Sequence, residues 1–217
     1  MNIPLAEHFH STQGEGVHVG RPMHFLRLPG CSVGKRDPQG PLLPTGAAAW
    51  KCHTWDGRPF HCDTDFNKHE EVPLQDLMNE TWEHRLCLTG GEPLVHSELV
   101  MTLEEECARR LKHCHIETSG TIRWQKFYDA TWLTVSPKLG ALPEMLVCAD
   151  EIKLLVDTDF DLQSVPQEIR NRTNVFVQPV NYLASINFAS VEKCLEVLRA
   201  FPGWRLSPQV HKLLFQR

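Results

Sequence analysis

From about residue 72 onward, short apolar segments alternate with amphipathic ones along the chain. Short apolar runs bounded by polar or turn residues are typical of buried strands, whereas apolar positions that repeat every three or four residues indicate helices. Strands are expected at 85–89, 115–118, 132–135, 151–156, 174–178 and 204–206. This alternation predicts a parallel sheet whose strands are joined by crossover helices.

Two of the amphipathic segments have clear apolar faces. These faces consist of Leu99, Leu103, Cys107 and Leu111 in the first and of Val191, Cys194, Leu195 and Leu198 in the second. An earlier strand at 23–28 brings the total to about seven, whereas a full barrel of about 250 residues closes with eight strands and eight helices. The expected fold class is therefore α/β, with an incomplete, TIM-like barrel of parallel strands.

Size and charge limit the class of protein further. A chain of 217 residues, 41% of them hydrophobic, is expected to form a single domain over 1–217 with a core of its own. The net charge of -5 argues against a nucleic-acid-binding face. The first residues lack the pattern of a signal peptide, and no apolar run approaches the roughly 20 residues of a membrane span. A soluble, cytoplasmic enzyme is expected.

The connection between the first strand and the first helix, 31–66, is long and rich in Gly, Pro, Cys and His. A connection of more than about 15 residues without a periodic pattern is uncommon and usually functional, so we expect an irregular binding loop. Three of the eight cysteines lie in it, namely Cys31, Cys52 and Cys62. Three thiolates can hold a four-iron, four-sulfur cluster that keeps one iron open. A zinc site completed by His53 or His61, or unpaired thiols, would use the same residues.

The other cysteines are expected to be small apolar core residues. They are Cys87, Cys107, Cys114, Cys148 and Cys194.

A Gly-Gly-Glu-Pro segment, 90–93, follows the strand expected at 85–89. Its glycines allow the backbone to approach a ligand closely, and an acidic side chain at a strand end can receive an ammonium group. Alone, such a tetrapeptide indicates only a turn. Cysteines after a first strand, followed by Gly-Gly-Glu-Pro after a second, are the order found in radical S-adenosylmethionine enzymes.

Over nearly its whole length the sequence resembles the 7-carboxy-7-deazaguanine synthase family. The shared blocks are FHSTQGEG at 9–16, FLRLPGC at 25–31, CDTDF at 62–66, LTGGEPL at 88–94, IETSGT at 116–121, VSPK at 135–138, EIK at 151–153, QPV at 178–180 and WRLSPQVHK at 204–212. The resemblance implies a lyase that contracts 6-carboxy-5,6,7,8-tetrahydropterin to 7-carboxy-7-deazaguanine and releases ammonia. That product serves the biosynthesis of queuosine-type nucleosides of transfer RNA.

The resemblance also implies the ligands of each group. The cluster is held by Cys31, Cys52 and Cys62; S-adenosylmethionine, the source of a 5'-deoxyadenosyl radical, contacts Gly90, Gly91, Glu92, Glu117, Ser119, Ser136 and Lys138. Thr64 is implied to bind Mg²⁺ beside the substrate carboxylate. The implied pterin site consists of Gln13, Glu15, Arg27, Asp63, Thr89, Gln178, Gln209 and His211.

The cysteine spacing departs from the family, in which the last two cysteines are separated by two residues. Here twenty residues separate Cys31 from Cys52 and nine separate Cys52 from Cys62, and Pro59 stands where the middle cysteine is expected. If Cys52 is not a ligand, His53 or His61 is the next candidate.

The family resemblance further implies a homodimer and a flavodoxin- or ferredoxin-type electron donor, which could dock on the cysteine-rich segment. Two other functions remain open. One is another radical S-adenosylmethionine enzyme, such as a glycyl-radical activating enzyme, and the other is a non-catalytic zinc-binding scaffold.

Overall fold

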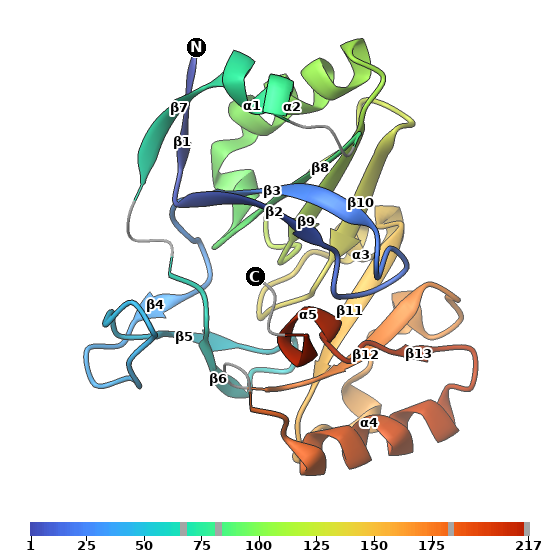
Figure 1. The fold of residues 1–217 in the computed structure, drawn as a ribbon. Coiled ribbons are helices and arrows are strands. Elements are labelled where there is room, and N and C mark those ends of the chain that lie inside the picture. Colours follow the sequence, from blue (N-terminus) through green and yellow to red (C-terminus); the bar gives the residue numbers. More distant parts are fainter. Residues whose placement is uncertain (66–68, 81–83, 182–184, 215–217) are drawn as a thin grey trace.

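An eight-stranded sheet forms the centre of the computed structural model, which describes residues 1–65, 69–80, 84–181 and 185–214. The strand order is β13-β12-β11-β10-β9-β8-β3-β2 (Figure 1). The strands are β2 Glu7–Thr12, β3 Pro22–Leu28, β8 Arg85–Gly90, β9 His113–Thr118, β10 Thr131–Val135, β11 Glu151–Val156, β12 Val175–Pro179 and β13 Arg205–Leu206. Every neighbouring pair from β3 to β13 is parallel, so the predicted parallel sheet is confirmed.

Three strands outside the cysteine-rich segment were not predicted. β2 pairs antiparallel with β3 at one edge of the large sheet, and β1 (Asn2–Leu5) pairs antiparallel with β7 (Glu70–Pro73) in a separate two-stranded sheet. The apolar pattern missed β2 because its residues, EHFHST, include a single large apolar side chain. The large sheet is therefore mostly, rather than wholly, parallel.

The two faces of the large sheet differ in chemistry because side chains alternate along each strand. One face packs into the hydrophobic core through Leu26, Leu28, Leu86, Leu88, Cys114, Ile116, Leu133, Val135, Ile152, Leu154, Val156, Val175 and Val177. The alternate positions form the opposite face and include Arg27, Thr89, Glu117, Lys153 and Gln178. The polar side chains of the sheet are thus collected on one face, near the carboxyl ends of the strands.

Helices α2 (Ser97–Arg109), α3 (Pro143–Cys148) and α4 (Phe188–Ala200) contribute further residues to the core. Leu103 and Cys107 of α2 are buried, as predicted. Leu111, however, lies beyond the end of α2 with a φ of 55° and is 90% exposed, because the chain turns there toward β9. In α4 the prediction was wrong for Leu195, which is 43% exposed, whereas Cys194 and Val197 are buried.

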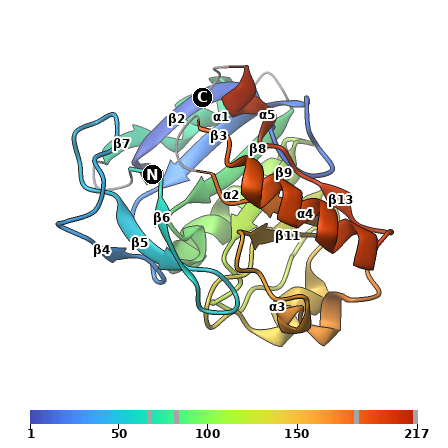
Figure 2. The same cartoon turned by 90° about the horizontal axis from the view of Figure 1, so that it is seen from below.

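The cysteine-rich segment contains a three-stranded antiparallel sheet, so the expectation of an irregular loop was wrong. Its strands are β4 (Lys35–Arg36), β5 (Trp50–His53) and β6 (Pro59–Cys62). Strands of two to four residues are too short to produce a recognisable sequence period. Figure 2 shows this small sheet and α4 on opposite sides of the molecule. Phe66, the expected end of the segment, lies outside the described residues.

The remaining elements are short: helices α1 (Leu74–Glu80) and α5 (Val210–Leu213), and the 3-10 turns η1 (Pro93–His96), η2 (Leu162–Ser164) and η3 (Gln167–Ile169). Among the described residues the longest helices, α2 and α4, have 13 residues each, too few to span a bilayer.

Candidate active site

The polar face of the sheet brings predicted site residues from separate strands side by side. Arg27 of β3 is paired with Thr89 of β8, and Glu117 of β9 is paired with Thr134 of β10. The Thr89 hydroxyl donates to Glu117 at 3.3 Å, which links the two pairs. These positions lie within two residues of the carboxyl ends of their strands, where sites of parallel α/β folds gather.

Two cavities meet at this face, with volumes of about 210 and 660 Å³. We call them the thiol cavity and the carboxylate cavity. Residues that line both are Asp63, Thr89, Gly90, Glu117, Gln209 and Lys212. The shared walls make the cavities two halves of one site.

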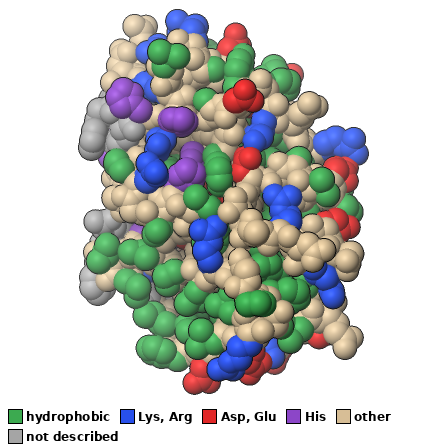
Figure 3. Space-filling model, turned by 90° about the vertical axis from the view of Figure 1, so that its right-hand side faces the viewer, with side chains coloured by type: hydrophobic (Ala, Val, Ile, Leu, Met, Phe, Trp, Pro, Cys, Tyr) green, Lys and Arg blue, Asp and Glu red, His purple; other side chains and the backbone are tan. Residues whose placement is uncertain are grey.

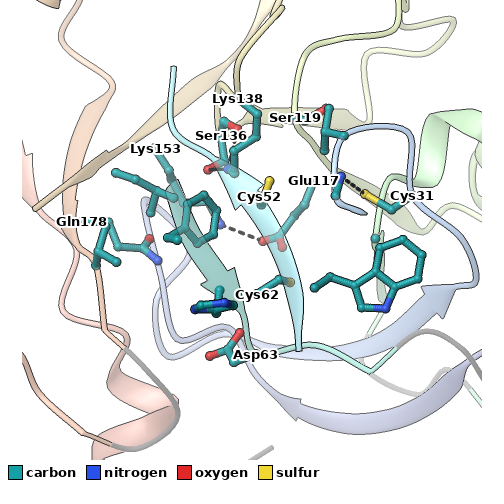
Figure 4. A pocket seen from close by; sticks show the side chains of 18 of the residues that line it. Cys31, Cys52, Cys62, Asp63, Glu117, Ser119, Ser136, Lys138, Lys153 and Gln178 are labelled. Atoms are coloured by element: carbon teal, nitrogen blue, oxygen red, sulfur yellow. Dashed lines mark hydrogen bonds and ion pairs between the residues drawn. The ribbon is translucent and has the colours of Figure 1, made fainter. Parts of the chain in front are cut away.

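Cys31, Cys52 and Cys62 all line the thiol cavity, and their sulfur atoms point into it (Figure 4). The register of the β5–β6 hairpin explains the last two: Trp50 lies opposite Cys62, so that Cys52, two residues along, falls on the same face of the ladder as Cys62. Burial raises the pKa of both thiols, and the neighbouring sulfur atoms raise it further. The hairpin therefore brings the two thiols together across two strands, as a short cysteine spacing would bring them together within one loop.

The histidine alternatives to Cys52 are placed differently. His53 lines a separate outer cavity together with Ser32 and Lys35. His61 borders the thiol cavity, but its Nε2 lies 3.3 Å from Asp37 Oδ2.

The arrangement of the thiols differs from that of a site for a single metal ion. Within the described part of the chain, no group of three or more His, Cys, Asp or Glu side chains is arranged to hold one metal ion. In a four-iron cluster each thiolate binds a different iron, so its ligands need not converge on one point. Three thiols around one cavity, with Cys52 buried and Cys31 and Cys62 partly buried, are a donor set that fits such a cluster.

The two glycines of the Gly-Gly-Glu-Pro segment allow the chain to approach itself. A Cβ on Gly90 would collide with the Leu28 carbonyl oxygen, and a Cβ on Gly91 would collide with the Gly30 carbonyl oxygen. The Glu92 amide donates to Gly30 at 3.1 Å. These contacts hold the Cys31 loop against the end of β8. The close approach that the glycines allow is therefore one between two segments of this chain.

Glu92 is the one predicted site residue that lines neither cavity. It is fully buried, and its oxygens accept hydrogen bonds from the Thr118 hydroxyl and from the amide and hydroxyl of Ser119. Its position orients Ser119, which does line the thiol cavity. The predicted contact of Glu92 with an amino group stays a prediction.

Lys138 and Ser136 line the thiol cavity beside the hairpin. The Lys138 ammonium donates to the backbone oxygen and to the hydroxyl of Ser136, each at 2.8 Å. Burial lowers the pKa of Lys138, while the nearby Cys52 raises it. A bridge between Thr54 and Lys138 joins this wall to the hairpin.

Most of the residues predicted to bind a pterin line the carboxylate cavity, whereas Gln178 lines the thiol cavity. Gln13 donates to Glu117 at 3.0 Å, while Gln178 and Gln209 donate to Glu15 Oε1 at 3.2 and 2.9 Å. His211 packs against Gly14, and burial lowers its pKa.

Two cationic side chains of this cavity are already partnered. The Arg27 guanidinium donates to Glu7 at 2.8 Å and to the Thr64 hydroxyl at 3.4 Å. Asp63 accepts from Lys212 at 2.5 Å. Arg27, Thr64 and Lys212 therefore group at one end of the cavity.

Sequence reasoning assigned no role to Lys153, which lies at the centre of the site. Its ammonium donates to Glu15 Oε2 at 2.5 Å and to Glu117 Oε1 at 3.2 Å. Burial would raise the pKa of Glu15, but Lys153 and Gln209 lower it to about 2. The available signal was a single lysine within the otherwise apolar end of β11, EIKLLV.

Known proteins resemble the chain over its full length. It is 30% identical to a 7-carboxy-7-deazaguanine synthase of Prochlorococcus marinus, with 98% of this chain and 97% of the relative aligned. The synthases of Escherichia coli and Aquifex aeolicus are 30% and 31% identical, over 99% and 97% of this chain and 99% and 92% of theirs. A search of protein-family models found no match.

A solved structure shares the fold. The crystal structure of QueE from Escherichia coli superposes with a TM-score of 0.64 at 26% identity and covers 95% of this chain and 93% of its own. The mostly parallel sheet, with its thiols and charged groups at the strand ends, places the chain among the radical S-adenosylmethionine enzymes. Within them, it belongs to the 7-carboxy-7-deazaguanine synthase family.

Proposed function

We propose that this chain converts 6-carboxy-5,6,7,8-tetrahydropterin to 7-carboxy-7-deazaguanine with release of ammonia, as a lyase of queuosine biosynthesis. The observation that carries the proposal is the union of two cavities in one site. One is lined by three thiols and the other by carboxylates, amides and an arginine. The full-length similarity to synthases of that name supports the same reaction.

Cys31, Cys52 and Cys62 hold a four-iron, four-sulfur cluster at the thiol cavity in this proposal. Ser119, Ser136 and Lys138 bind S-adenosylmethionine beside it. When bound, the two groups together supply a 5'-deoxyadenosyl radical. The chain's own contribution is a polar wall, in which the Lys138 ammonium, fixed by Ser136, offers a positive charge to a carboxylate group.

The pterin lies in the carboxylate cavity. Glu15 accepts hydrogen bonds from its guanidine-like edge, Gln13 and Gln209 read its amide groups, and Arg27 binds its carboxylate. Mg²⁺ would be held by the Thr64 hydroxyl. The cavity wall around Thr64 also includes Asp63 and Asp65, and oxygen atoms are the ligands that Mg²⁺ prefers.

The fold and the partners complete the proposal. The large sheet is an incomplete barrel in which β2 and β13 are the end strands, and the chain is one domain. A flavodoxin- or ferredoxin-type donor docks at the outer cavity of about 430 Å³, whose lining includes Ser32, next to Cys31, and His53, next to Cys52. The enzyme is a homodimer, which its mass in solution would test.

The test is anaerobic reconstitution with iron and sulfide, followed by incubation with the pterin, S-adenosylmethionine, Mg²⁺ and a reductant. We expect about four irons per chain and a product with the mass and ultraviolet spectrum of 7-carboxy-7-deazaguanine. About one zinc and no sulfide would support the scaffold function instead. Cleavage of S-adenosylmethionine without any deazaguanine would indicate a different radical enzyme.

A further inference from the structure

Lys153 lies where the two halves of the site meet. It lines the thiol cavity, while its partner Glu15 lines the carboxylate cavity and its partner Glu117 lines both. The Lys153 side chain is 6% exposed, and those of Glu15 and Glu117 are 12% and 22% exposed. Figure 4 shows the Lys153 side chain reaching from β11 toward Glu117. A buried lysine with two carboxylate partners costs desolvation energy, so its retention in the site needs a reason.

The charges around Lys153 supply that reason. Three carboxylates approach its ammonium, from the loop after β2, from β9 and from β11: Glu15, Glu117 and Glu151. Burial would lower the pKa of Lys153, but these carboxylates raise it well above its ordinary value. Without the ammonium, three acidic groups would share one buried space, and such groups take up protons.

Further titratable groups face the same cluster. The charge of Lys153 acts on Cys87, His115, Lys138 and His211, and the charge of Arg27 also acts on Cys87. The pKa values of His115 and His211 are lowered, so both rings are neutral near pH 7. Lys138 donates to Ser136 and Arg27 donates to Glu7, so each is held by another partner.

We propose that Lys153 is a positioning residue that fixes Glu15 and Glu117 as a pair of ionised acceptors spanning both cavities. Glu15 then accepts from the guanidine-like edge of a 2-amino-4-oxo-pyrimidine ring, and Glu117 accepts from hydroxyl groups of a ligand in the thiol cavity. A carboxylate oxygen accepts two hydrogen bonds, so Glu15 Oε2 retains one acceptor position after Lys153 has used the other. The inference rests on the proposed function, because that function supplies a ligand with such an edge.

The test measures binding of 7-carboxy-7-deazaguanine to the reconstituted holoenzyme by calorimetry between about pH 6 and 8.5, a window above the ordinary pKa of a carboxyl. The variant is Lys153→Met, which keeps the length of the side chain and removes its charge. Lys126→Met is the matched control, because it breaks the Lys126–Asp150 ion pair away from both cavities.

Wild-type enzyme is expected to bind with an affinity that is nearly constant over this window. Lys153→Met is expected to bind about tenfold more weakly or worse, the effect of losing a hydrogen bond between charged partners. Its affinity should also fall as the pH is lowered, because the unpaired carboxylates now protonate inside the window. Lys153→Arg should restore the constant profile, and Lys126→Met should lower the thermal midpoint but leave affinity and profile unchanged.

Wild-type affinity with a constant profile in Lys153→Met would overturn the inference while leaving the proposed function intact. A holoenzyme of wild-type sequence that binds no deazaguanine would overturn both.

Discussion

Individual residues decide whether the unusual cysteine spacing still forms a cluster site. Cys52 and Cys62 are separated by nine residues of sequence, but the β5–β6 register brings them onto one face of a single hairpin. Thr54 and Gly57 form the turn, in which the Gly57 amide donates to Thr54 at 3.0 Å. The residues between the two cysteines therefore form parts of two short strands and the turn that joins them.

Cys52→Ala is expected to remove most of the iron from anaerobically reconstituted protein, because two thiolates cannot retain a cluster that needs three. Iron and sulfide per chain, with the visible absorption of the cluster, measure the effect. Cys148→Ala is the control and should keep about four irons, since the Cys148 sulfur lies against the carbonyl oxygens of Trp124 and Met145. Full iron content in Cys52→Ala together with its loss in His61→Ala would assign the third ligand to His61.

Sequence motifs identified many site residues but not the residue that holds two of them in place. Arg27, Thr89 and Glu117 were placed in the site by the family resemblance, and the structure brings them together. Lys153 was missed because its role depends on Glu15, which is 138 residues away in sequence. Contacts over such separations are set by strand order, which a single strand's pattern does not contain.

At the scale of elements, the β5–β6 hairpin is anchored at its tip. The Arg58 guanidinium donates to both oxygens of Asp56, at 2.8 and 2.9 Å, and forms an ion pair with Asp157 beyond the end of β11. It also stacks over the Phe160 ring at 5.2 Å. The Trp55 indole donates to the Ser164 carbonyl at 3.1 Å. The hairpin that carries two thiols is thus fixed to the main sheet.

Arg58→Met is expected to loosen the cluster without unfolding the chain. Removal of one partner from a largely buried ion pair costs about 3 kcal/mol, and this cost falls on the hairpin rather than on the core. Iron retained after gel filtration, and the rate at which the visible absorption fades in the presence of a chelator, should report weaker binding. Arg123→Met, which breaks an exposed pair with Glu144, should behave as wild type. Equal retention in both variants would show that the tip contacts do not support the thiols.

Elements were predictable in proportion to their apolar content. The strands β3, β8, β9, β10, β11 and β12 bury half or more of their residues, and their parallel pairing was expected. β2, β4 and β5 contain few buried side chains and were not expected. Backbone pairing, rather than apolar burial, defines these strands, and pairing leaves little trace in sequence.

The two faces of the large sheet have different roles in the whole molecule. Side chains on one face pack with α2, α3 and α4 in the core, and side chains on the opposite face line the site. Each face of the sheet also buries a histidine: His24, on the side of Leu26 and Leu28, is fully buried in β3, and His115, on the side of Glu117, is 3% exposed in β9. Figure 3 shows further histidines gathered beside Lys and Arg side chains on one face.

These histidines should make the fold sensitive to mild acid. Burial, reinforced by neighbouring histidine and basic side chains, lowers the pKa of His24 and of His115 to about 3. In the unfolded chain both titrate near pH 6.5, so below that pH the unfolded state binds more protons than the folded state. Each ring should therefore remove up to about 1.4 kcal/mol of stability for each pH unit between about 6.5 and 3.

His18 adds to the same slope, because burial and nearby arginines lower its pKa to about 4, and other groups add smaller or later effects. Burial raises the pKa of Glu151, so this carboxyl binds its proton more readily in the folded state and opposes the histidines by at most one proton. The pKa of Glu15 is about 2, so its contribution to stability is lost only as the pH falls below its ordinary value near 4.5. Between about pH 6.5 and 5 the histidines should dominate.

Urea unfolding of the metal-free chain at a series of pH values measures this slope. We expect the free energy of unfolding to be nearly constant above about pH 7 and to fall steadily from there to pH 5. His24→Gln and His115→Gln should each reduce the pH dependence of the unfolding free energy by the contribution of about one proton. This reduction is expected whatever the substitution does to the stability at neutral pH. Lys126→Met, which lowers stability without touching these rings, should keep the full slope. A wild-type chain whose stability is the same at pH 5 and pH 7 would mean that the two rings are protonated in the folded state, and hence that water reaches both of them.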